Sequence, residues 1–190
     1  MDILQQEIDN SVAALKQGKV ILYPTDTIWG IGADATNSKA VQRIYKIKRR
    51  NLDKSMIILL DSMEKLKDYV AEVSEVSYEL IEKTRVPLTI VYPKAKNLAK
   101  NLVAKDGSIA IRVVDGEYCS AVIKKLGKPI VSTSANLSGE APPITFNNVS
   151  RVIITKVDYV VGLFHERINT LKPSTVIKMG SDGMFEILRP

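Results

Sequence analysis

Short apolar, β-branched runs alternate with amphipathic helical patterns along this sequence, and that alternation restricts the possible folds more than any other feature. The first helix is expected over residues 4–15, with Gly18 in a left-handed C-terminal cap, and residues 19–23 form the first expected strand. The apolar face of this helix consists of Leu4, Ile8, Val12 and Leu15. Such alternation predicts a layered α/β domain with a largely internal sheet.

The remaining elements continue this alternation. Helices are expected at residues 37–48, with Asn37 as N-cap, and at 62–70, 74–83, 117–126 and 147–154; strands are expected at 56–60, 88–92, 108–113, 129–131, 158–161, 175–178 and 185–188. Residues 56–60 are apolar throughout, which is typical of a strand buried on both faces. The last two strands have no helix between them, so we expect a mixed sheet. No repeat or linker interrupts the sequence, so residues 1–190 are expected to form one domain.

Composition limits the classes of function. No apolar stretch approaches the ~20 residues that span a bilayer, and residues 1–7 lack a signal-peptide pattern, so a cytoplasmic location is expected. Cys119 is the only cysteine and no metal-ligand spacing occurs, so neither an internal disulfide nor a protein-bound metal is expected. His165, the only histidine, has no catalytic signature beside it and is expected at the surface. The net charge of +6 favours anionic partners such as nucleotides or RNA, although a basic soluble surface would give the same charge.

A polar loop is expected to follow the strand at 129–131. Its residues are Ser132, Thr133, Ser134, Ala135, Asn136, Leu137, Ser138 and Gly139. Ligands of open α/β sheets bind beyond the carboxyl ends of strands, so this loop is placed to donate hydrogen bonds to a phosphate. An ordinary turn, in which serine and asparagine bond to their own backbone, is the alternative. The density of small hydroxyl donors favours the ligand site.

A second candidate is the sequence Lys48-Arg49-Arg50 at the end of the helix at 37–48. Lys48 and Arg50 could converge on a polyanion, because arginine offers a bidentate fork to phosphate and lysine supplies a point charge. Alternatively, these cations complement the negative end of the helix dipole and remain in solvent. The residues by themselves leave both interpretations open.

Residues 24–32 also follow a strand and include the only tryptophan, Trp29. They fit either a ligand-binding loop with an aromatic wall or a core tryptophan in a glycine turn. The segment starting at Gly30 matches the dinucleotide-binding fingerprint in letters, and Asp53 follows roughly 20 residues later, as its acidic ribose partner would. We reject that fingerprint, because it requires a glycine directly after the strand and Gly30 is well separated from Tyr23. The sequence has no Walker A lysine motif either.

Four segments together resemble the YrdC-like threonylcarbamoyl-AMP synthase family, in its single-domain, bacterial type. They are residues 24–30, 48–50, 109–112 and 132–139. The paired signature of that family is K-x-R followed far downstream by S-x-N, which here reads Lys48-x-Arg50 and Ser134-x-Asn136. The match covers nearly the whole chain, and the order and spacing of the segments are specific. The resemblance implies a YrdC-like α/β fold, a twisted mixed sheet with flanking helices around a basic cavity.

The resemblance also implies a reaction: L-threonine, bicarbonate and ATP give threonylcarbamoyl-AMP and pyrophosphate. The product supplies the N6-threonylcarbamoyl group of adenosine 37 in tRNAs that read codons beginning with A. Further partners implied are Mg²⁺ carried by the ATP phosphates, tRNA itself, and tRNA threonylcarbamoyl-transfer proteins. In this chemistry a carboxylate attacks the α-phosphorus, so catalysis depends on positioning and on neutralising phosphate charge.

The site residues of the family are carried over to matching positions. Those expected to be catalytic are Lys48, Arg50, Ser134 and Asn136, with Lys48 facing the phosphates or bicarbonate. Those expected to bind the nucleotide are Arg50, Lys54, Ser108, Ser134, Asn136 and Arg189. Those expected to bind threonine are Thr27, Arg112, Ser132, Thr133 and Ser174, with Arg112 pairing with the threonine carboxylate.

The sequence departs from the family pattern at several points. Asn51 replaces a common proline after K-x-R, and residues 85–89 replace a common Pro-Gly-Pro-x-Thr sequence. Leu59 stands where some members have histidine, a change in the expected threonine pocket. Because Arg189 is followed only by Pro190, the extra C-terminal domain of longer relatives is expected to be absent.

Two alternatives remain at this point. A non-catalytic module of the same fold could bind double-stranded RNA or tRNA through its phosphates, and such binding should weaken steeply as salt rises. A paralogue could keep the fold and lose the synthase activity. The intact Ser134-x-Asn136 sequence argues against the paralogue, since loss of activity is expected to remove part of the signature.

Overall fold

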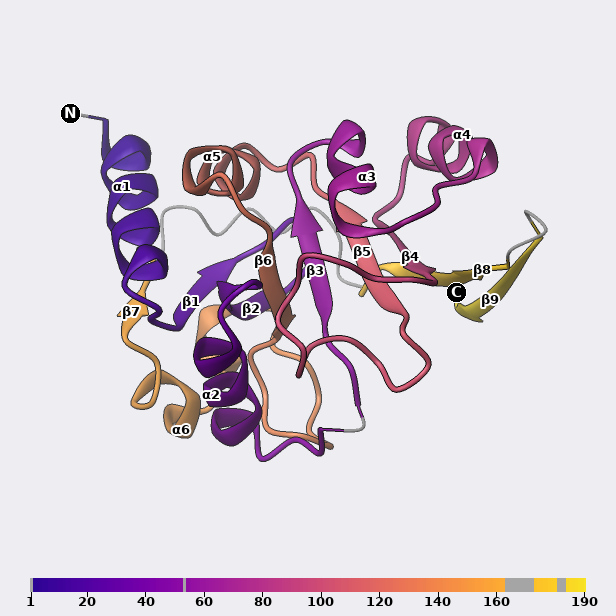
Figure 1. Ribbon diagram of the computed structural model, residues 1–190. Helices are drawn as coiled ribbons and strands as arrows, with labels where there is room; N and C mark the ends of the chain where they lie inside the picture. Colours follow the sequence, from indigo (N-terminus) through magenta and orange to yellow (C-terminus); the bar gives the residue numbers. More distant parts are fainter. Residues whose placement is uncertain (1, 53, 163–172, 181–183) are drawn as a thin grey trace.

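The computed structural model describes residues 2–52, 54–162, 173–180 and 184–190 (Figure 1). Its helices are α1 (Ile3–Lys16), α2 (Ser38–Lys48), α3 (Leu66–Tyr69), α4 (Glu75–Lys83), α5 (Glu117–Leu126) and α6 (Arg151–Ile154), with the 3-10 turns η1 (Met63–Lys65) and η2 (Phe146–Asn148). Its strands are β1 (Ile21–Pro24), β2 (Trp29–Asp34), β3 (Ile57–Leu60), β4 (Leu88–Tyr92), β5 (Ile109–Val113), β6 (Ile130–Ser134), β7 (Tyr159–Val160), β8 (Thr175–Met179) and β9 (Phe185–Arg189). Within the described residues, no helix combines the length and the apolar character needed to cross a membrane.

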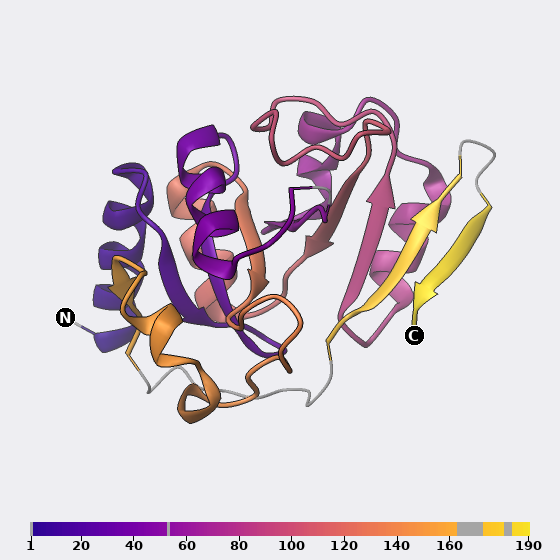
Figure 2. The same cartoon turned by 90° about the horizontal axis from the view of Figure 1, so that it is seen from below.

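The strands pair into a single mixed sheet. Over the described part of the chain its order is β7-β1-β2-β6-β3-β5-β4-β8-β9. The pairs β1–β7, β3–β5 and β4–β8 are parallel, and the other pairs are antiparallel. The β8–β9 hairpin forms the edge of the sheet opposite β7 (Figure 2). The expected α/β fold with a mixed sheet is confirmed.

Two apolar clusters bury the two faces of this sheet. In β3, Ile58 and Leu60 belong to the cluster that includes the buried side chains of α2, whereas Leu59 belongs to the cluster that includes those of α1 and α5. Successive side chains of a strand point to opposite faces, so α2 covers one face and α1 with α5 the other. The prediction that residues 56–60 contain a strand buried on both faces is therefore confirmed.

The helix caps expected from the sequence are present, and the end of α2 has a further left-handed residue that was not expected. The side chain of Asn37 accepts hydrogen bonds from the backbone N–H groups of Lys39 and Ala40, as expected for an N-cap. Gly18 follows α1 with a φ of 71°, in the left-handed conformation expected there. At the end of α2 the left-handed position is taken by Arg49, with a φ of 50°, which is uncommon for a residue with a side chain. This turn redirects the chain between the two cations of K-x-R.

The structure corrects the interpretation of residues 24–32. Residues 29–34 are the strand β2, which pairs with both β1 and β6, and Trp29 is almost fully buried against Phe146. The core alternative for Trp29 therefore holds, although in a strand and not in a glycine turn. Gly30 and Gly32 lower the β-propensity of this segment, which is why its pattern did not predict a strand.

Other boundaries differ from the expected ones. β6 continues to Ser134, so three residues assigned to a loop, 132–134, form the end of a strand. The helical pattern at 147–154 is divided between η2 and α6, and the strand expected at 158–161 is reduced to Tyr159–Val160. His165 and Asp53 lie outside the described residues.

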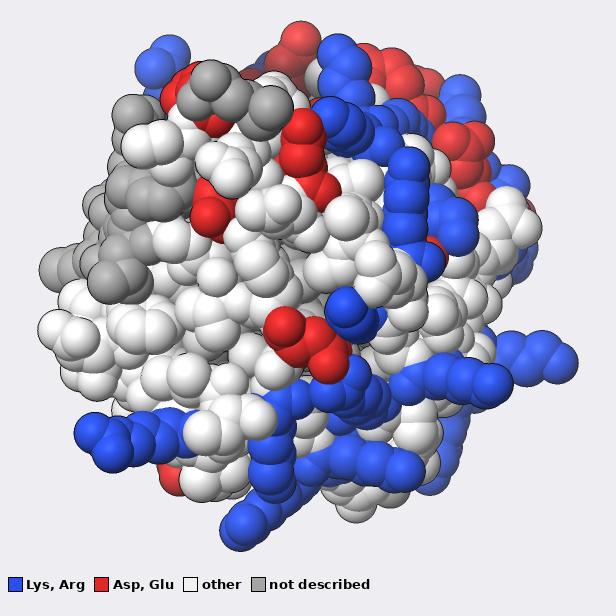
Figure 3. Space-filling view, turned by 90° about the vertical axis from the view of Figure 1, so that its left-hand side faces the viewer, with Lys and Arg blue, Asp and Glu red and all other residues white. Residues whose placement is uncertain are grey.

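Positive charge is concentrated on part of the surface. Figure 3 shows lysine and arginine side chains gathered along the lower edge of one face, at the level where Figure 1 places α2 and α6. Much of the rest of that view is uncharged. Some of the lysines and arginines behind the net charge of +6 therefore lie together in one basic region of the surface.

Gly32 lies where β2 approaches its neighbours most closely. A Cβ atom there would be 2.8 Å from Cγ2 of Ile130 and 2.9 Å from Cε1 of Tyr23. We expect Gly32→Ala to lower the free energy of unfolding by about 1–3 kcal/mol, because an added methyl group in a packed core forces its neighbours apart. Urea unfolding measures this change. Gly30→Ala on the same strand is the control, since its nearest contacts would be at 3.4 Å. Equal losses in the two variants would contradict the steric explanation.

Candidate functional site

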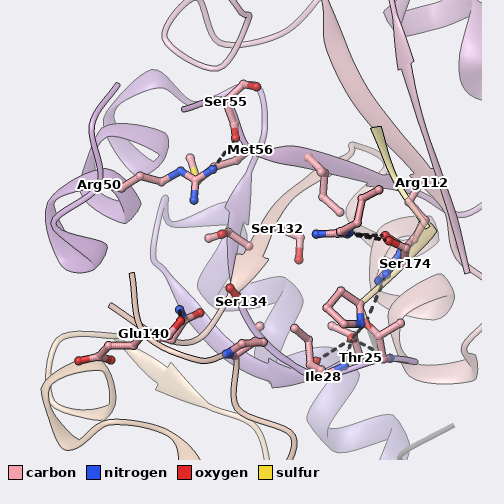
Figure 4. A pocket seen from close by; sticks show the side chains of 18 residues that line it. Thr25, Ile28, Arg50, Ser55, Met56, Arg112, Ser132, Ser134, Glu140 and Ser174 are labelled. Atoms are coloured by element: carbon pink, nitrogen blue, oxygen red, sulfur yellow. Dashed lines mark hydrogen bonds between the residues drawn. The ribbon is translucent and has the colours of Figure 1, made fainter. Parts of the chain in front are cut away.

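A cavity of about 350 Å³ is lined by β2, β3, β5, β6 and residues beside β8 and β9 (Figure 4). This volume is within the usual range of small-molecule sites. Along one face of β6 the side chains change from Ile130, which packs with the α1 and α5 cluster, to Ser132 and Ser134, which line the cavity. The replacement of a large apolar side chain by small polar ones provides the room.

Most of the site residues expected from the sequence lie together on this wall. They are Thr27, Arg50, Arg112, Ser132, Thr133, Ser134, Asn136, Ser174 and Arg189. They come from segments between residues 27 and 189 of the chain, and the sheet brings them together. The wall contains three arginines and one carboxylate, that of Glu140, so the cavity is basic, as the resemblance implied.

Three expected site residues are not on the wall of the cavity: Lys48, Lys54 and Ser108. Ser108 is buried and donates its hydroxyl to Oδ1 of Asp106 at 2.6 Å. Lys54 contributes its backbone carbonyl, which accepts a hydrogen bond from Nε of Arg50. Lys48 is buried beside the cavity and contacts the loop that forms part of its wall.

Arg50 is held against the chain segment that leads into β3. Its Nε donates to the carbonyl of Lys54 and its Nη2 donates to the carbonyl of Ser55, both at 2.8 Å. These two bonds fix the orientation of the guanidinium, which lines the cavity (Figure 4). Burial lowers the pKa of Arg50 from its ordinary value, but arginine remains charged in proteins.

Lys48 joins the end of α2 to the loop after β6 at three points. Its Nζ donates to the carbonyl of Ser134 and, at 2.7 Å, to the carbonyl of Asn136. Its own backbone carbonyl accepts a hydrogen bond from the N–H of Ser138 at 3.0 Å. The two halves of the signature, K-x-R and S-x-N, are therefore in direct contact. We call this set of three bonds the Lys48 clamp.

Lys48 is 1% exposed, so keeping its ammonium group charged costs free energy. Burial, and secondly the positive charge of Arg50, lower the pKa of Lys48 to about 7, while Glu140 opposes this shift. The two carbonyl oxygens accept from both N–H groups of a neutral amine, or from two of the three N–H groups of an ammonium. This arrangement serves to hold the loop, and the charge of Lys48 does not face the cavity.

Arg112 on β5 is fixed by groups from the loop between β1 and β2. Its Nη2 donates to Oδ1 of Asp26 at 2.8 Å, and its Nη1 donates to Oγ1 of Thr27 at 3.3 Å. The side chain of Arg112 is 4% exposed, so this ion pair is nearly removed from water. A buried arginine that keeps one carboxylate partner is held in place for a second anion.

Arg189 approaches the same end of the cavity from β9. Its Nε and Nη2 donate to the carbonyl of Ser174 at 3.0 and 2.7 Å, and the hydroxyl of Ser174 is 2.8 Å from the hydroxyl of Thr89. Burial, and then the charge of Arg112, lower the pKa of Arg189. The positive charge of Arg112 therefore raises the free energy of the charged Arg189 side chain, and an anion beside them would lower it.

Two polar atoms of the site lack partners within the described structure. Nε of Arg112 and Oδ1 of Asn136 are buried and make no hydrogen bond there, although the Nδ2 of Asn136 donates to the carbonyls of Leu137 and Glu140. Buried polar atoms without partners are costly and uncommon in folded proteins. A ligand that brings an acceptor to Arg112 and a donor to Asn136 would remove that cost.

Sequence reasoning missed several residues on the wall. They are Thr25, Ile28, Gly30, Ser55, Met56, Ile57, Glu140, Pro142 and Pro173. Thr25, Ile28 and Gly30 belong to the segment considered as a ligand loop, so a signal for them existed. Thr25 supports this part of the wall, because its Oγ1 donates to the carbonyl of Ile28 at 2.7 Å. Ser55, Met56 and Pro173 reach the wall only through the pairing of distant strands.

Other candidate chemical groups fall outside the cavity. Cys119 is buried, and burial raises the pKa of its thiol to about 12, which suits a core residue and not a nucleophile. Among the described residues, no group of three or more His, Cys, Asp or Glu side chains could hold a metal ion.

Comparison with known proteins covers nearly the whole chain. The sequence model of the Sua5/YciO/YrdC family, which is described as telomere recombination, matches residues 13–190. A protein of Photobacterium profundum named threonylcarbamoyl-AMP synthase is 38% identical over 152 residues, which are 78% of this chain and 80% of that protein. Residues 13–190, which the family model matches, include every segment that lines the cavity.

Solved structures agree with the sequence matches. Sua5 of P. abyssi, in complex with L-threonine, superposes with a TM-score of 0.83 at 29% identity, covering 90% of this chain and 50% of the Sua5 chain. The matched region thus spans about half the length of that Sua5 protein. YciO of E. coli superposes with a TM-score of 0.83 at 25% identity, covering 97% of this chain and 89% of YciO. From the family match, the identity to a named relative and the shared fold, the chain belongs to the Sua5/YciO/YrdC family.

Proposed function

We propose that the protein is a threonylcarbamoyl-AMP synthase, which converts L-threonine, bicarbonate and ATP into threonylcarbamoyl-AMP and pyrophosphate. One observation carries this proposal: a single basic cavity contains Arg50 beside the S-x-N loop and Arg112 with Arg189 on other strands. Such a wall offers separate places to a phosphate chain and to an amino-acid carboxylate. The names of the relatives support this assignment.

Arg50, Ser134 and Asn136 are assigned to the nucleotide. The guanidinium of Arg50 would contact its phosphates, and the hydroxyl of Ser134 and the amide of Asn136 would bind at the adenylate phosphate. Mg²⁺ would arrive with the phosphates, because Glu140 is the one carboxylate on the described wall and its Oε2 already accepts from the N–H of Leu137. Lys54 and Ser108, which lie off the wall, would act only through neighbouring groups.

Arg112 is assigned to the threonine carboxylate, with Thr27, Ser132, Thr133 and Ser174 around the amino acid. The complex of P. abyssi Sua5 with L-threonine supports a threonine site in this fold. The buried and unpartnered Nε of Arg112 is the donor that a carboxylate would satisfy. Asp26 keeps the guanidinium at this end of the cavity and away from the phosphates.

The proposed chemistry requires few groups from the protein. The amine of threonine attacks the carbon of bicarbonate and water is lost, which gives an N-carboxy-threonine. The carboxylate of this carbamate then attacks the α-phosphorus of ATP and displaces pyrophosphate. The protein aligns the two reactants and neutralises charge that develops on the phosphates, so neither a nucleophilic side chain nor a strong base is needed. Lys48 would act as a positioning residue, since it holds the S-x-N loop and does not face the substrates.

The product would pass to tRNA threonylcarbamoyl-transfer proteins for the modification of adenosine 37, which places the proposed reaction in the cytoplasm, and tRNA itself could contact the basic surface. A module that only binds double-stranded RNA or tRNA is the alternative. The cavity argues against it, because an RNA-binding surface needs no pocket lined by buried, unpartnered polar atoms. RNA binding without turnover, falling steeply with added salt, would favour the alternative.

Pyrophosphate should appear from ATP only when threonine and bicarbonate are both present. We expect Arg50→Ala and Asn136→Ala each to reduce this rate by about a hundredfold or more, because each removes a preorganised contact to the phosphates. Arg151→Ala, an exposed change on α6, is the matched control and should leave the rate unchanged. ATP turnover that is indifferent to threonine would exclude the proposed reaction.

Arg112→Lys should separate threonine binding from nucleotide binding. Lysine keeps the positive charge but lacks the planar fork that pairs with a carboxylate, so we expect the KM for threonine to rise about tenfold or more while the KM for ATP stays nearly constant. Steady-state kinetics with each substrate varied in turn measures both values, and Arg151→Lys is the control. An equal rise in both KM values would contradict the assignment of Arg112.

Lys48→Met should change the pH dependence of stability. In the wild type the folded pKa of Lys48, about 7, is below the ordinary value of 10.5, so between these values the unfolded state binds more protons. Stability therefore gains a contribution from Lys48 as pH rises from about 7 towards 10.5. We expect the slope of unfolding free energy against pH over this window to be smaller in Lys48→Met than in the wild type. Identical slopes, measured by urea unfolding, would refute the lowered pKa.

A further inference from the structure

A second hollow lies on the outer side of α2 and shares no residue with the cavity. It has a volume of about 500 Å³ and is lined by Ser38, Lys39, Gln42, Lys46, Lys100 and Asn101, which we call the α2 groove. Lys39, Gln42 and Lys46 recur at helical spacing, so they lie along one face of α2. Lys100 and Asn101 come from the connection between β4 and β5 and form the facing wall.

The facing wall is fixed to the body of the protein. Ala99 and Leu102, on either side of Lys100 and Asn101, are buried, and the N–H of Ala99 donates to the carbonyl of Ala35 at 2.9 Å. The Nδ2 of Asn101 reaches across to α2, where it donates to the carbonyl of Ser38 at 3.0 Å and to Oε1 of Gln42 at 3.4 Å. The groove is thus preorganised, unlike a set of lysines on a free loop.

The groove has positive charge and no compensating carboxylate. All six of its lining residues are lysines or neutral polar residues. The ion pairs found in the described part of the chain use other lysines, namely Lys65, Lys83, Lys94, Lys125, Lys128 and Lys178. Cations that converge without counter-charges favour an anion between them. Figure 3 shows the basic edge at the level of α2.

The spacing of the lysines indicates what kind of anion fits the groove. Lys39 and Lys46 are seven residues apart on α2, or ~10 Å along the helix axis, so together with Lys100 they suit an elongated anion better than a single small one.

We propose that the α2 groove is a second anion site, separate from the cavity, that binds a chain of two or more phosphate groups. Free oligophosphates and the backbone of a nucleic acid strand both offer this chemistry. Lysine ammonium groups supply point charges to successive phosphates, and Ser38 and Gln42 add neutral hydrogen bonds between them. The proposal stands independently of the reaction catalysed in the cavity.

The test is a calorimetric titration of the intact protein with inorganic tripolyphosphate at low salt. The variant Lys39→Ala/Lys46→Ala/Lys100→Ala should bind about tenfold or more weakly, because it removes the three ammonium groups that line the groove. The control Lys16→Ala/Lys83→Ala/Lys124→Ala removes the same net charge from exposed positions elsewhere and should bind nearly as the wild type does. Thermal unfolding of both variants checks that they are folded.

Arg50→Ala distinguishes the groove from the cavity, since tripolyphosphate bound in the groove should remain bound in this variant. Equal affinities of the two triple-lysine variants, or binding that is lost in Arg50→Ala and kept in the groove variant, would overturn the proposal. A parallel titration with a single-stranded oligonucleotide identifies the source of the phosphates. Tighter binding of the oligonucleotide that depends on the groove lysines indicates a nucleic acid backbone, and tighter binding of tripolyphosphate indicates a free oligophosphate.

Discussion

The contact between the Lys48 ammonium and the carbonyls of Ser134 and Asn136 is the interaction on which the site depends. It joins the last residue of α2 to the end of β6, two elements that are far apart in the sequence. A buried amine is tolerated only when its donors are satisfied, so the position of the loop and the burial of Lys48 require each other. The left-handed turn at Arg49 then allows Arg50 to line the cavity while Lys48 remains behind the wall.

The cavity exists because the side chains on one face of the sheet change from large and apolar to small within a few residues. On the face covered by α1 and α5, Ile130 and Leu59 are apolar and buried, whereas Ser132, Ser134 and Gly30 leave space. The mixed topology brings the carboxyl end of β6 beside the amino ends of β2 and β3, since both pair with it antiparallel. The rule that ligands bind beyond the carboxyl ends of strands thus describes β6 and β1, whose following loop supplies Thr25 and Thr27, but it does not describe β2 and β3.

Without a ligand, charged and polar groups of the site are incompletely paired, and a bound ligand would lower their free energy. Arg112 and Arg189 share one end of the cavity, and Asp26 is the carboxylate that pairs with Arg112. Unpartnered atoms on Arg112 and Asn136 raise this free energy further. Preorganised charges that are incompletely satisfied without ligand are what binding and transition-state stabilisation require, because the protein need not reorganise when the anion arrives. α2 contributes to two such regions, with Arg50 beyond its end and lysines on its outer face.

The sequence by itself determined the order of the elements other than β2, the doubly buried strand β3, the helix caps at Asn37 and Gly18, and half of the residues on the cavity wall, because periodicity, capping chemistry and a spaced signature are local properties. It did not determine that residues 29–34 form a strand, since the glycine at position 32 is explained only by the close approach of Ile130 and Tyr23. Nor did it show that Lys48 faces a loop and not a substrate. The K-x-R pattern shows which cations are present, but not which of them lines the cavity. Burial and strand pairing decide that, and both depend on contacts between segments that are distant in the sequence.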